Sequence, residues 1–222
     1  AGEPTINIVH EDIIQPAGAT YSASKARQEE FIAGTDMWFR PIHTRIGPDG
    51  ALYVVDFYNQ AVVHNDTRGP KHGAGNAAVR PDRDHHFGRI WRVQHKEAKK
   101  LDQPRLTRHK PADLVKALEH PNSFYRMSAH RMLAELADES VVPSLQALAE
   151  SAQPAFARIH ALWVLNSIGR LQASPLTAAS SDSDAAIRKN AIRIAAENPR
   201  AGGPNLKKTL LARIKDENPR VR

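Results

Sequence analysis

The sequence predicts a mixed fold in which strands come first and helices follow: a four-stranded antiparallel propeller-blade fragment, then an α-solenoid of paired helices. Two observations carry this prediction. Up to His95, short segments rich in β-branched and aromatic residues alternate with tight turns, which is typical of antiparallel strands. Beyond His95, arginines and prolines recur about every 30 residues among helically spaced apolar residues, which is typical of repeated helix pairs.

The predicted blade spans residues 39–93 and belongs to a propeller portion that covers residues 1–95. Its four strands are expected at residues 41–46, 51–57, 61–64 and 88–93. The Gly-Pro-Asp-Gly sequence at 47–50 favours a tight turn between the first two strands. Pieces of a preceding blade are expected at residues 6–9 and 30–33.

A long loop is predicted at residues 66–87, because this stretch holds many Gly and Pro residues and almost no bulky apolar ones. Imidazoles and carboxylates flank the loop, and these groups suit a divalent metal. They are His64, Asp66, Asp82, Asp84, His85 and His86. Their spacing matches no compact ligand motif, so a solvated polar loop is favoured and no metal site is predicted. Asp49 could ligate calcium, but a bond to its own turn backbone is favoured.

Residues 96–110 form a basic linker, and residues 111–222 are expected to form HEAT-like repeats, the last of them truncated. Proline suits the first turn of a helix, since its missing N–H would have no partner there. First helices are therefore expected near Pro111, Pro143, Pro175 and Pro204. Second helices are expected near Ser123, Pro154, Asp184 and Pro219. The repeat signal is a series of arginines at positions 126, 158, 188 and 220, with spacings of 32, 30 and 32 residues.

Composition narrows the possible functions. The chain of 222 residues has no cysteine, which excludes disulfides, thiolate catalysis and covalent haem attachment within it. No apolar run is long enough for a membrane segment. The formal charge of +7 is uneven, with 10 Lys and Arg against 11 Asp and Glu up to His95, and 21 against 13 after it. A basic second half suits polyanions, or is simply a solvated helical surface, which is favoured.

The run Asp36-Met37-Trp38-Phe39-Arg40-Pro41, then residues 47–58 and 88–93, resembles the PVC-type membrane-bound dehydrogenase family. In that family a sorbosone- or glucose-dehydrogenase-like propeller precedes HEAT repeats, and a cytochrome c domain follows. The resemblance implies that this chain corresponds to the last propeller blade plus the HEAT repeats. It also implies a bacterial, periplasmic or extracytoplasmic protein. No cofactor is expected within these residues, whereas a PQQ-like quinone and haem c are implied for a longer protein.

Two residues on the first blade strand are the candidate catalytic and cofactor-binding groups, because this strand lines the central channel of a propeller. Arg40 could pair with a quinone carboxylate, and His43 could accept a substrate proton. The alternative for Arg40 is a structural tie to Asp36 or Asp56.

The arginine series at 126, 158 and 188 could grip nucleic-acid phosphates. Structural pairing with acids on neighbouring repeats, such as Asp182 or Glu135, is favoured instead. Trp163 lies among apolar neighbours and is expected in the core.

Three functions therefore stand side by side. The first is part of a quinone-dependent sugar or aldose oxidoreductase, inactive by itself, whose HEAT repeats dock a protein partner or haem domain. The second is a non-enzymatic interaction scaffold, since a fold does not decide function. The third, nucleic-acid or polyanion binding by the basic helices, is disfavoured. No phosphate loop, nucleophile elbow or His-Glu-x-x-His motif supports another enzyme class.

Overall fold

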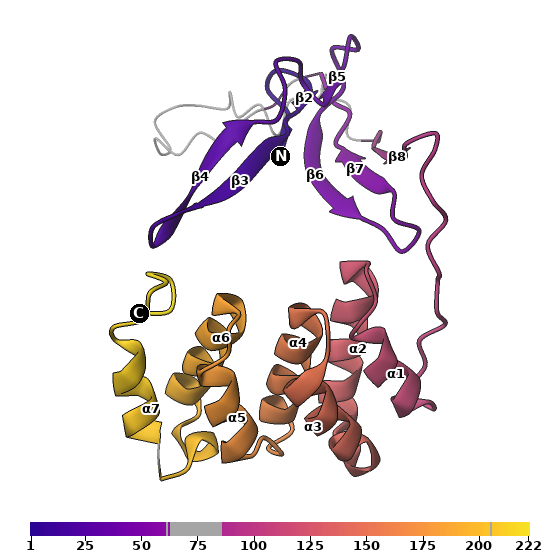
Figure 1. The fold of residues 1–222 in the computed structure, drawn as a ribbon. Coiled ribbons are helices and arrows are strands. Elements are labelled where there is room, and N and C mark those ends of the chain that lie inside the picture. The colour runs from indigo at the N-terminus through magenta and orange to yellow at the C-terminus, as the bar shows by residue number, and fades with distance from the viewer. Residues whose placement is uncertain (61, 63–85, 205) are drawn as a thin grey trace, which may run out of the picture. The chain divides into compact units, whose positions relative to one another are not determined.

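The structure, a computed structural model, shows strands in the first half and helices in the second, which confirms the predicted mixed fold (Figure 1). It describes residues 1–60, 62, 86–204 and 206–222. The chain divides into two compact units, one of residues 1–15 and 22–101 and the other of residues 16–21 and 102–222. Each unit is considered by itself below.

Short strands build three sheets in the described part of the chain, with orders β1-β2-β5, β3-β4 and β6-β7-β8. The strands are β1 (Gly2–Glu3), β2 (Ile8–Val9), β3 (Asp12–Ala17), β4 (Thr20–Lys25), β5 (Ile32–Ala33), β6 (Pro41–Ile46), β7 (Leu52–Asp56) and β8 (Arg89–Val93). β6, β7 and β8 are antiparallel and match three of the four predicted blade strands. Of the fourth, at 61–64, only residue 62 is described, and most of the predicted loop at 66–87 lies outside the described residues.

Turn chemistry fixes the β6–β7 connection. Asp49 accepts a bond from the Ala51 amide at 3.1 Å, which confirms the favoured interpretation of this aspartate as a turn residue. Gly50 has a φ of +79°, a conformation that glycine adopts without steric cost. The sheet then buries one face, where Val9, Phe39 and Val54 form a small apolar core.

Seven α-helices follow in the described part of the chain. They are α1 (Pro111–Ala117), α2 (Ser123–Leu136), α3 (Val142–Ser151), α4 (Ala155–Ser167), α5 (Ala173–Ser180), α6 (Ala185–Glu197) and α7 (Leu206–Arg213). One 3₁₀ turn, η3 (Glu139–Val141), precedes α3, and another, η4 (Pro199–Gly202), follows α6. Among these helices, none has the length and apolar content that a membrane crossing requires.

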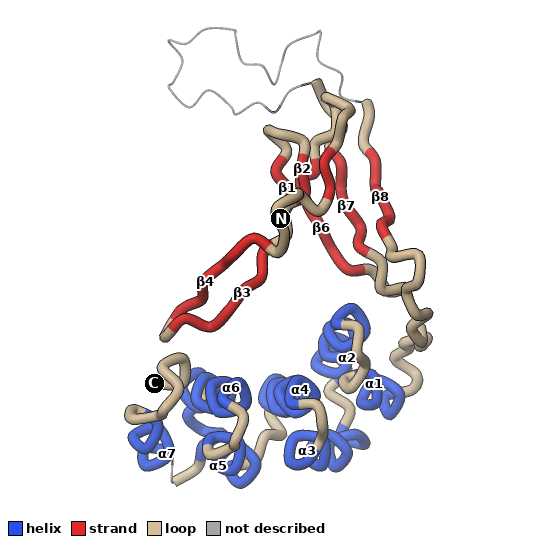
Figure 2. The backbone as a smooth tube through the Cα atoms, turned by 45° about the horizontal axis from the view of Figure 1, so that its top comes forward, coloured by secondary structure: helices blue, strands red, loops and turns tan. Residues whose placement is uncertain are grey.

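The helices pack as consecutive pairs, α1 with α2, α3 with α4 and α5 with α6. Helices α2, α4 and α6 contact one another in one layer, and α1, α3, α5 and α7 form a second layer (Figure 2). One apolar core runs through the pairs, because alanines such as Ala129, Ala161 and Ala191 let the helices approach closely while leucines fill the space between them.

The predicted helix starts agree with the structure to within two residues for all but the last helix. The exception is Pro219, where a second helix was expected. Residues 219–222 form a turn, in which the Val221 amide bonds to the Asn218 carbonyl at 2.9 Å. Asn218 accepts a bond from the Arg220 amide at 3.0 Å, as Asn122 and Asp184 do from the amides two residues ahead of them. Four residues provide only the first turn of a helix, which has no i→i−4 bonds of its own, so the helix at Pro219 stays a prediction.

Side-chain caps explain two of the helix starts. Asn122 and Asp184 accept bonds from the amides two residues ahead, at 2.9 and 2.7 Å, and each precedes a second helix. Before α4 the equivalent residue is Pro154, which offers no side-chain acceptor. Among the three helix pairs, the turn between α3 and α4 is therefore the one whose second helix has no side-chain cap.

Candidate functional site

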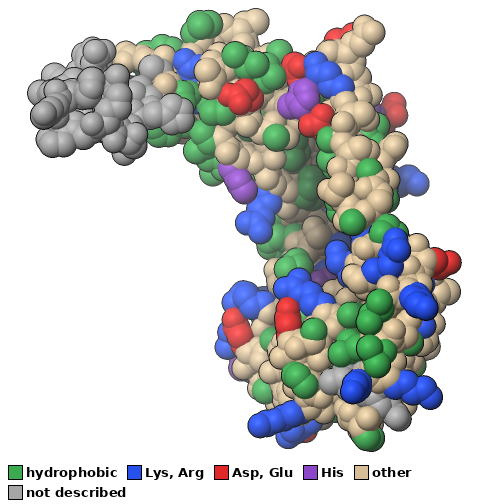
Figure 3. Space-filling view, turned by 90° about the vertical axis from the view of Figure 1, so that its left-hand side faces the viewer, with side chains coloured by type: hydrophobic (Ala, Val, Ile, Leu, Met, Phe, Trp, Pro, Cys, Tyr) green, Lys and Arg blue, Asp and Glu red, His purple; other side chains and the backbone are tan. Residues whose placement is uncertain are grey.

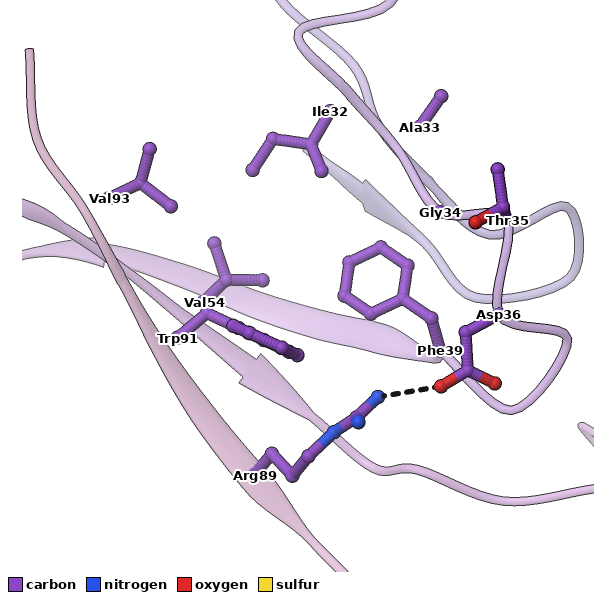
Figure 4. A pocket seen from close by; sticks show the side chains of 10 residues that line it. All are labelled: Ile32, Ala33, Gly34, Thr35, Asp36, Phe39, Val54, Arg89, Trp91 and Val93. Atoms are coloured by element: carbon purple, nitrogen blue, oxygen red, sulfur yellow. Dashed lines mark hydrogen bonds and ion pairs between the residues drawn. The ribbon is translucent and has the colours of Figure 1, made fainter.

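A pocket of about 320 Å³ lies between β5 and the sheet β6-β7-β8 (Figure 4). Its walls are mainly apolar and include Ile32, Phe39 and Val54, and its rim is polar. The rim is an ion pair between Asp36 and Arg89, at 3.3 Å. A pocket of this size and lining suits a small apolar group with one polar contact.

Asp56 organises the polar side of this unit, and its side chain is completely buried. One carboxylate oxygen accepts from the Arg40 and Tyr58 amides at 2.8 and 2.9 Å. The other accepts from Arg89 Nε at 3.0 Å and Trp91 Nε1 at 2.9 Å. Because both oxygens have two partners, this buried charge is satisfied and joins β7 to β8 and to the segment before β6.

Arg89 is held on several sides. Its guanidinium lies 3.5 Å from the Tyr58 ring centroid and 4.8 Å from that of Trp91. Burial opposes the charge of Arg89, but pairing with Asp56 and Asp36 raises its pKa. The pKa of Asp36 is lowered by the Trp38 amide first and by Arg89 second. Arg89 is therefore paired with two carboxylates at the pocket, those of Asp36 and Asp56.

Arg40, the predicted cofactor-binding residue, is a buried tie between backbone segments. Its Nε donates to the Asn59 carbonyl at 3.0 Å and its Nη2 to the Gln60 carbonyl at 2.9 Å. Its Nη1 donates to the Pro4 carbonyl at 2.9 Å. The structural alternative is thus supported, although the side chain holds carbonyls and only its backbone amide contacts Asp56. A role for Arg40 in cofactor binding stays a prediction.

His43, the predicted catalytic base, lies on β6 opposite Val55 and is exposed. Cross-strand pairing places it on the sheet face opposite that of Val54, since Thr44 and not His43 is the partner of Val54. The pocket uses Val54, so the structure does not bring His43 to it. Its catalytic role also stays a prediction.

The predicted metal-ligand candidates from His64 to His85 lie outside the described residues. His86 is described and exposed. In the described segments, no group of three or more His, Asp or Glu side chains is arranged to hold a metal ion.

The arginine series is structural where acids are available. Arg158 pairs with Asp182 at 2.6 Å, as the sequence predicts, and Arg188 pairs with Asp216 at 2.9 Å. Glu135 contacts Arg131 at 3.0 Å and none of the series. These arginines thus serve the helix packing, and the remaining Lys and Arg side chains are scattered among apolar and acidic ones on the face shown in Figure 3.

Sequence reasoning missed a pair of histidines, His130 on α2 and His160 on α4, whose Nδ1 atoms lie 3.1 Å apart. Burial lowers the pKa of both; for His160, burial, His130 and Arg126 together lower it to about 4. Their separation of 30 residues, close to the repeat length, was the available signal. Trp163, expected in the core, is partly buried against it and donates to Asn190 at 2.9 Å.

Residues 1–97 match the family model of a domain of unknown function, DUF7133. The match covers the strand unit and none of the helices. No curated protein matches the chain.

Proposed function

We propose that this chain is the docking portion of a propeller-type oxidoreductase, in which β6-β7-β8 belongs to a propeller blade and the helix pairs form a HEAT-like α-solenoid. The bare apolar surface of the sheet carries the proposal. Ile42, Ile46, Ile90 and Trp91 are 51, 45, 70 and 44% exposed, although strands of one small sheet carry all four. Ile46 and Trp91 lie on the sheet face of Val54, and Ile90 lies with Val55 on the opposite face, so apolar side chains are exposed on both faces of the sheet. Apolar surface on both faces marks contacts with other protein elements. Neighbouring blades are the contact that a propeller supplies.

The order of the units supports the same proposal, because strands precede helices as in the family that the sequence resembles. The site geometry agrees with a structural role for the strand unit, because Arg40 and Asp56 are buried and their polar atoms are used in bonds within the unit. In this proposal the helix pairs dock a haem domain or another protein partner outside the cytoplasm, and a quinone-dependent site for sugars is completed by a longer polypeptide.

The test is an aldose-dependent dye-reduction assay on the full-length protein with added quinone cofactor. We expect turnover with the full-length protein, none with residues 1–222 alone, and a loss of turnover in His43→Ala. Arg45→Ala is the matched control, because Arg45 is equally exposed on the same strand. No turnover over a broad sugar panel would overturn the oxidoreductase part of the proposal.

A non-enzymatic scaffold is the second candidate. It is favoured by the four hydrogen bonds that Asp56 accepts, because they commit this buried carboxylate to holding the sheet together. Photo-cross-linking from a photo-reactive residue at position 90 tests whether the sheet contacts another part of the protein, independently of whether the protein is an enzyme. Cross-links from position 90 to another segment of the full-length protein support the blade assignment whether or not the protein is an enzyme. The same yield from the exposed position 96, which lies beyond the end of β8, would argue against a specific contact at Ile90.

A further inference from the structure

Two arginines of the helix pairs, Arg126 and Arg188, hold their own turns in the same way, and the arrangement is complete at Arg188, whereas Arg158 Nε donates to the Ala149 carbonyl at 3.2 Å. Its Nη1 donates to the carbonyls of Asp182 and Ser183, six and five residues earlier, at 2.8 and 2.9 Å. Its Nε and Nη2 donate to the two oxygens of Asp216, both at 2.9 Å. One edge of the guanidinium therefore holds its own turn, and the other edge receives a carboxylate from the turn of the next repeat.

Counting back from the arginines gives the position that supplies this carboxylate. Asp182 pairs with Arg158 and lies six residues before Arg188. Asp216 lies six residues before Arg222, so the contacts make Arg222, and not Arg220, the fourth member of the series. The spacing to the fourth arginine is then 34 residues instead of the predicted 32.

Arg126 has the first half of this arrangement and lacks the second. Its Nη1 donates to the His120 and Pro121 carbonyls at 2.8 and 2.6 Å, again six and five residues earlier. The carboxylate position, six residues before Arg158, is Ala152, which has no side-chain acceptor. Among the described residues, Arg126 Nε is buried without a hydrogen-bond partner. A buried donor without a partner is costly.

The surroundings of Arg126 fit an anion. The ring of Phe156 packs against one face of the guanidinium, with its centroid 4.1 Å from Arg126 Cζ. Polar contacts can therefore form only at the edges of the guanidinium. Burial lowers the pKa of Arg126, whereas pairing with Asp216 raises that of Arg188. Arg126 also acts electrostatically on His160, on the next helix of the layer. Positive charge therefore stands uncompensated at this point of the α2–α4 layer.

We propose that Arg126 is a carboxylate-binding site, in which an external carboxylate takes the place that Asp182 and Asp216 occupy at the neighbouring arginines. The Nε and Nη2 edge of Arg126 receives the two carboxylate oxygens. A small aliphatic dicarboxylate and an acidic side chain of a partner protein both present this chemistry.

The test is a titration of the full chain with glutarate at constant ionic strength, followed by NMR of the arginine Nε–H and histidine signals. We expect saturable shifts centred on Arg126 and His160. Ala152→Asp supplies the missing carboxylate internally, so it should bind glutarate at least about tenfold more weakly and melt at a higher temperature. Ala152→Asn, the matched neutral variant, should bind as the unmodified chain does.

Two further arms identify the source and the class of the anion. Stronger binding of a Glu-containing peptide than of glutarate assigns the site to a protein partner, whereas equal binding assigns it to small carboxylates. Stronger binding of inorganic phosphate overturns the carboxylate assignment. Equal glutarate affinity in Ala152→Asp and the unmodified chain, or no saturable shift at all, overturns the site.

Discussion

Acidification should weaken the helical unit through His130 and His160, beginning near pH 6.5 and therefore before most carboxylates titrate. The pKa of His160 is lowered from 6.5 to about 4 in the folded chain. The unfolded chain therefore takes up the proton more readily, so this contribution to stability is complete above pH 6.5 and is lost as the pH falls toward 4. His130 shifts in the same direction and adds to the effect.

The size of the effect follows from linkage. Between pH 7.5 and 5, a shift from 6.5 to about 4 corresponds to about 2 kcal/mol for one histidine. Because His160 is only partly buried, solvent screening reduces this to about 1 kcal/mol. In the described part of the chain, the charged groups that act on His160 are His130, once protonated, and Arg126, and both of them oppose its protonation.

The assay is urea unfolding followed by circular dichroism at 222 nm, at pH 7.5 and pH 5, for the unmodified chain and for His160→Asn. Asparagine keeps a polar side chain but does not titrate in this window. We expect the unmodified chain to lose about 1 kcal/mol more than the variant on acidification. Equal losses in the two proteins would refute the reasoning.

Five further substitutions, of which Asp49→Asn and Glu217→Gln are the matched controls, test the buried charges and the core. Asp56→Asn should destabilise the strand unit by about 3 kcal/mol, because Arg89 loses its buried counter-charge. Asp49→Asn should destabilise it by about 1 kcal/mol or less. Tryptophan fluorescence in urea measures both changes. Asp216→Asn should cost about 3–5 kcal/mol, whereas Glu217→Gln, whose side chain is 87% exposed, should cost about 0.5 kcal/mol or less. Leu162→Ala should cost about 2–5 kcal/mol, since Leu162 is fully buried. Circular dichroism in urea follows the last three.

The order of strands and helices and most helix starts were predictable because they depend on local signals. Pro111 begins α1 as the proline rule predicts, and Asp184 caps α6. The turn at Asp49 was predictable for the same reason, since the side chain bonds its own backbone. These features depend on residues that are a few positions apart in the chain.

The candidate site was less predictable because its contacts join distant residues. Nothing near Asp56 in the sequence indicates that Arg89 and Trp91 converge on it, and the backbone carbonyls that Arg40 binds carry no sequence signal. The partners of His130 and Arg126 depend on how successive repeats align. One shift of two residues, from Arg220 to Arg222, was enough to hide the missing acid at Ala152.

The contacts of Arg126 and Arg89 also imply that the two units acquire their order at different speeds. Arg126 binds carbonyls five and six residues away, so the start of α2 is fixed by closing a very short loop. Arg89 binds acids 33 and 53 residues away, and such distant pairing raises the contact order. During synthesis the strand unit leaves the ribosome first but folds slowly, so the helices that follow it can be complete while the sheet is still assembling.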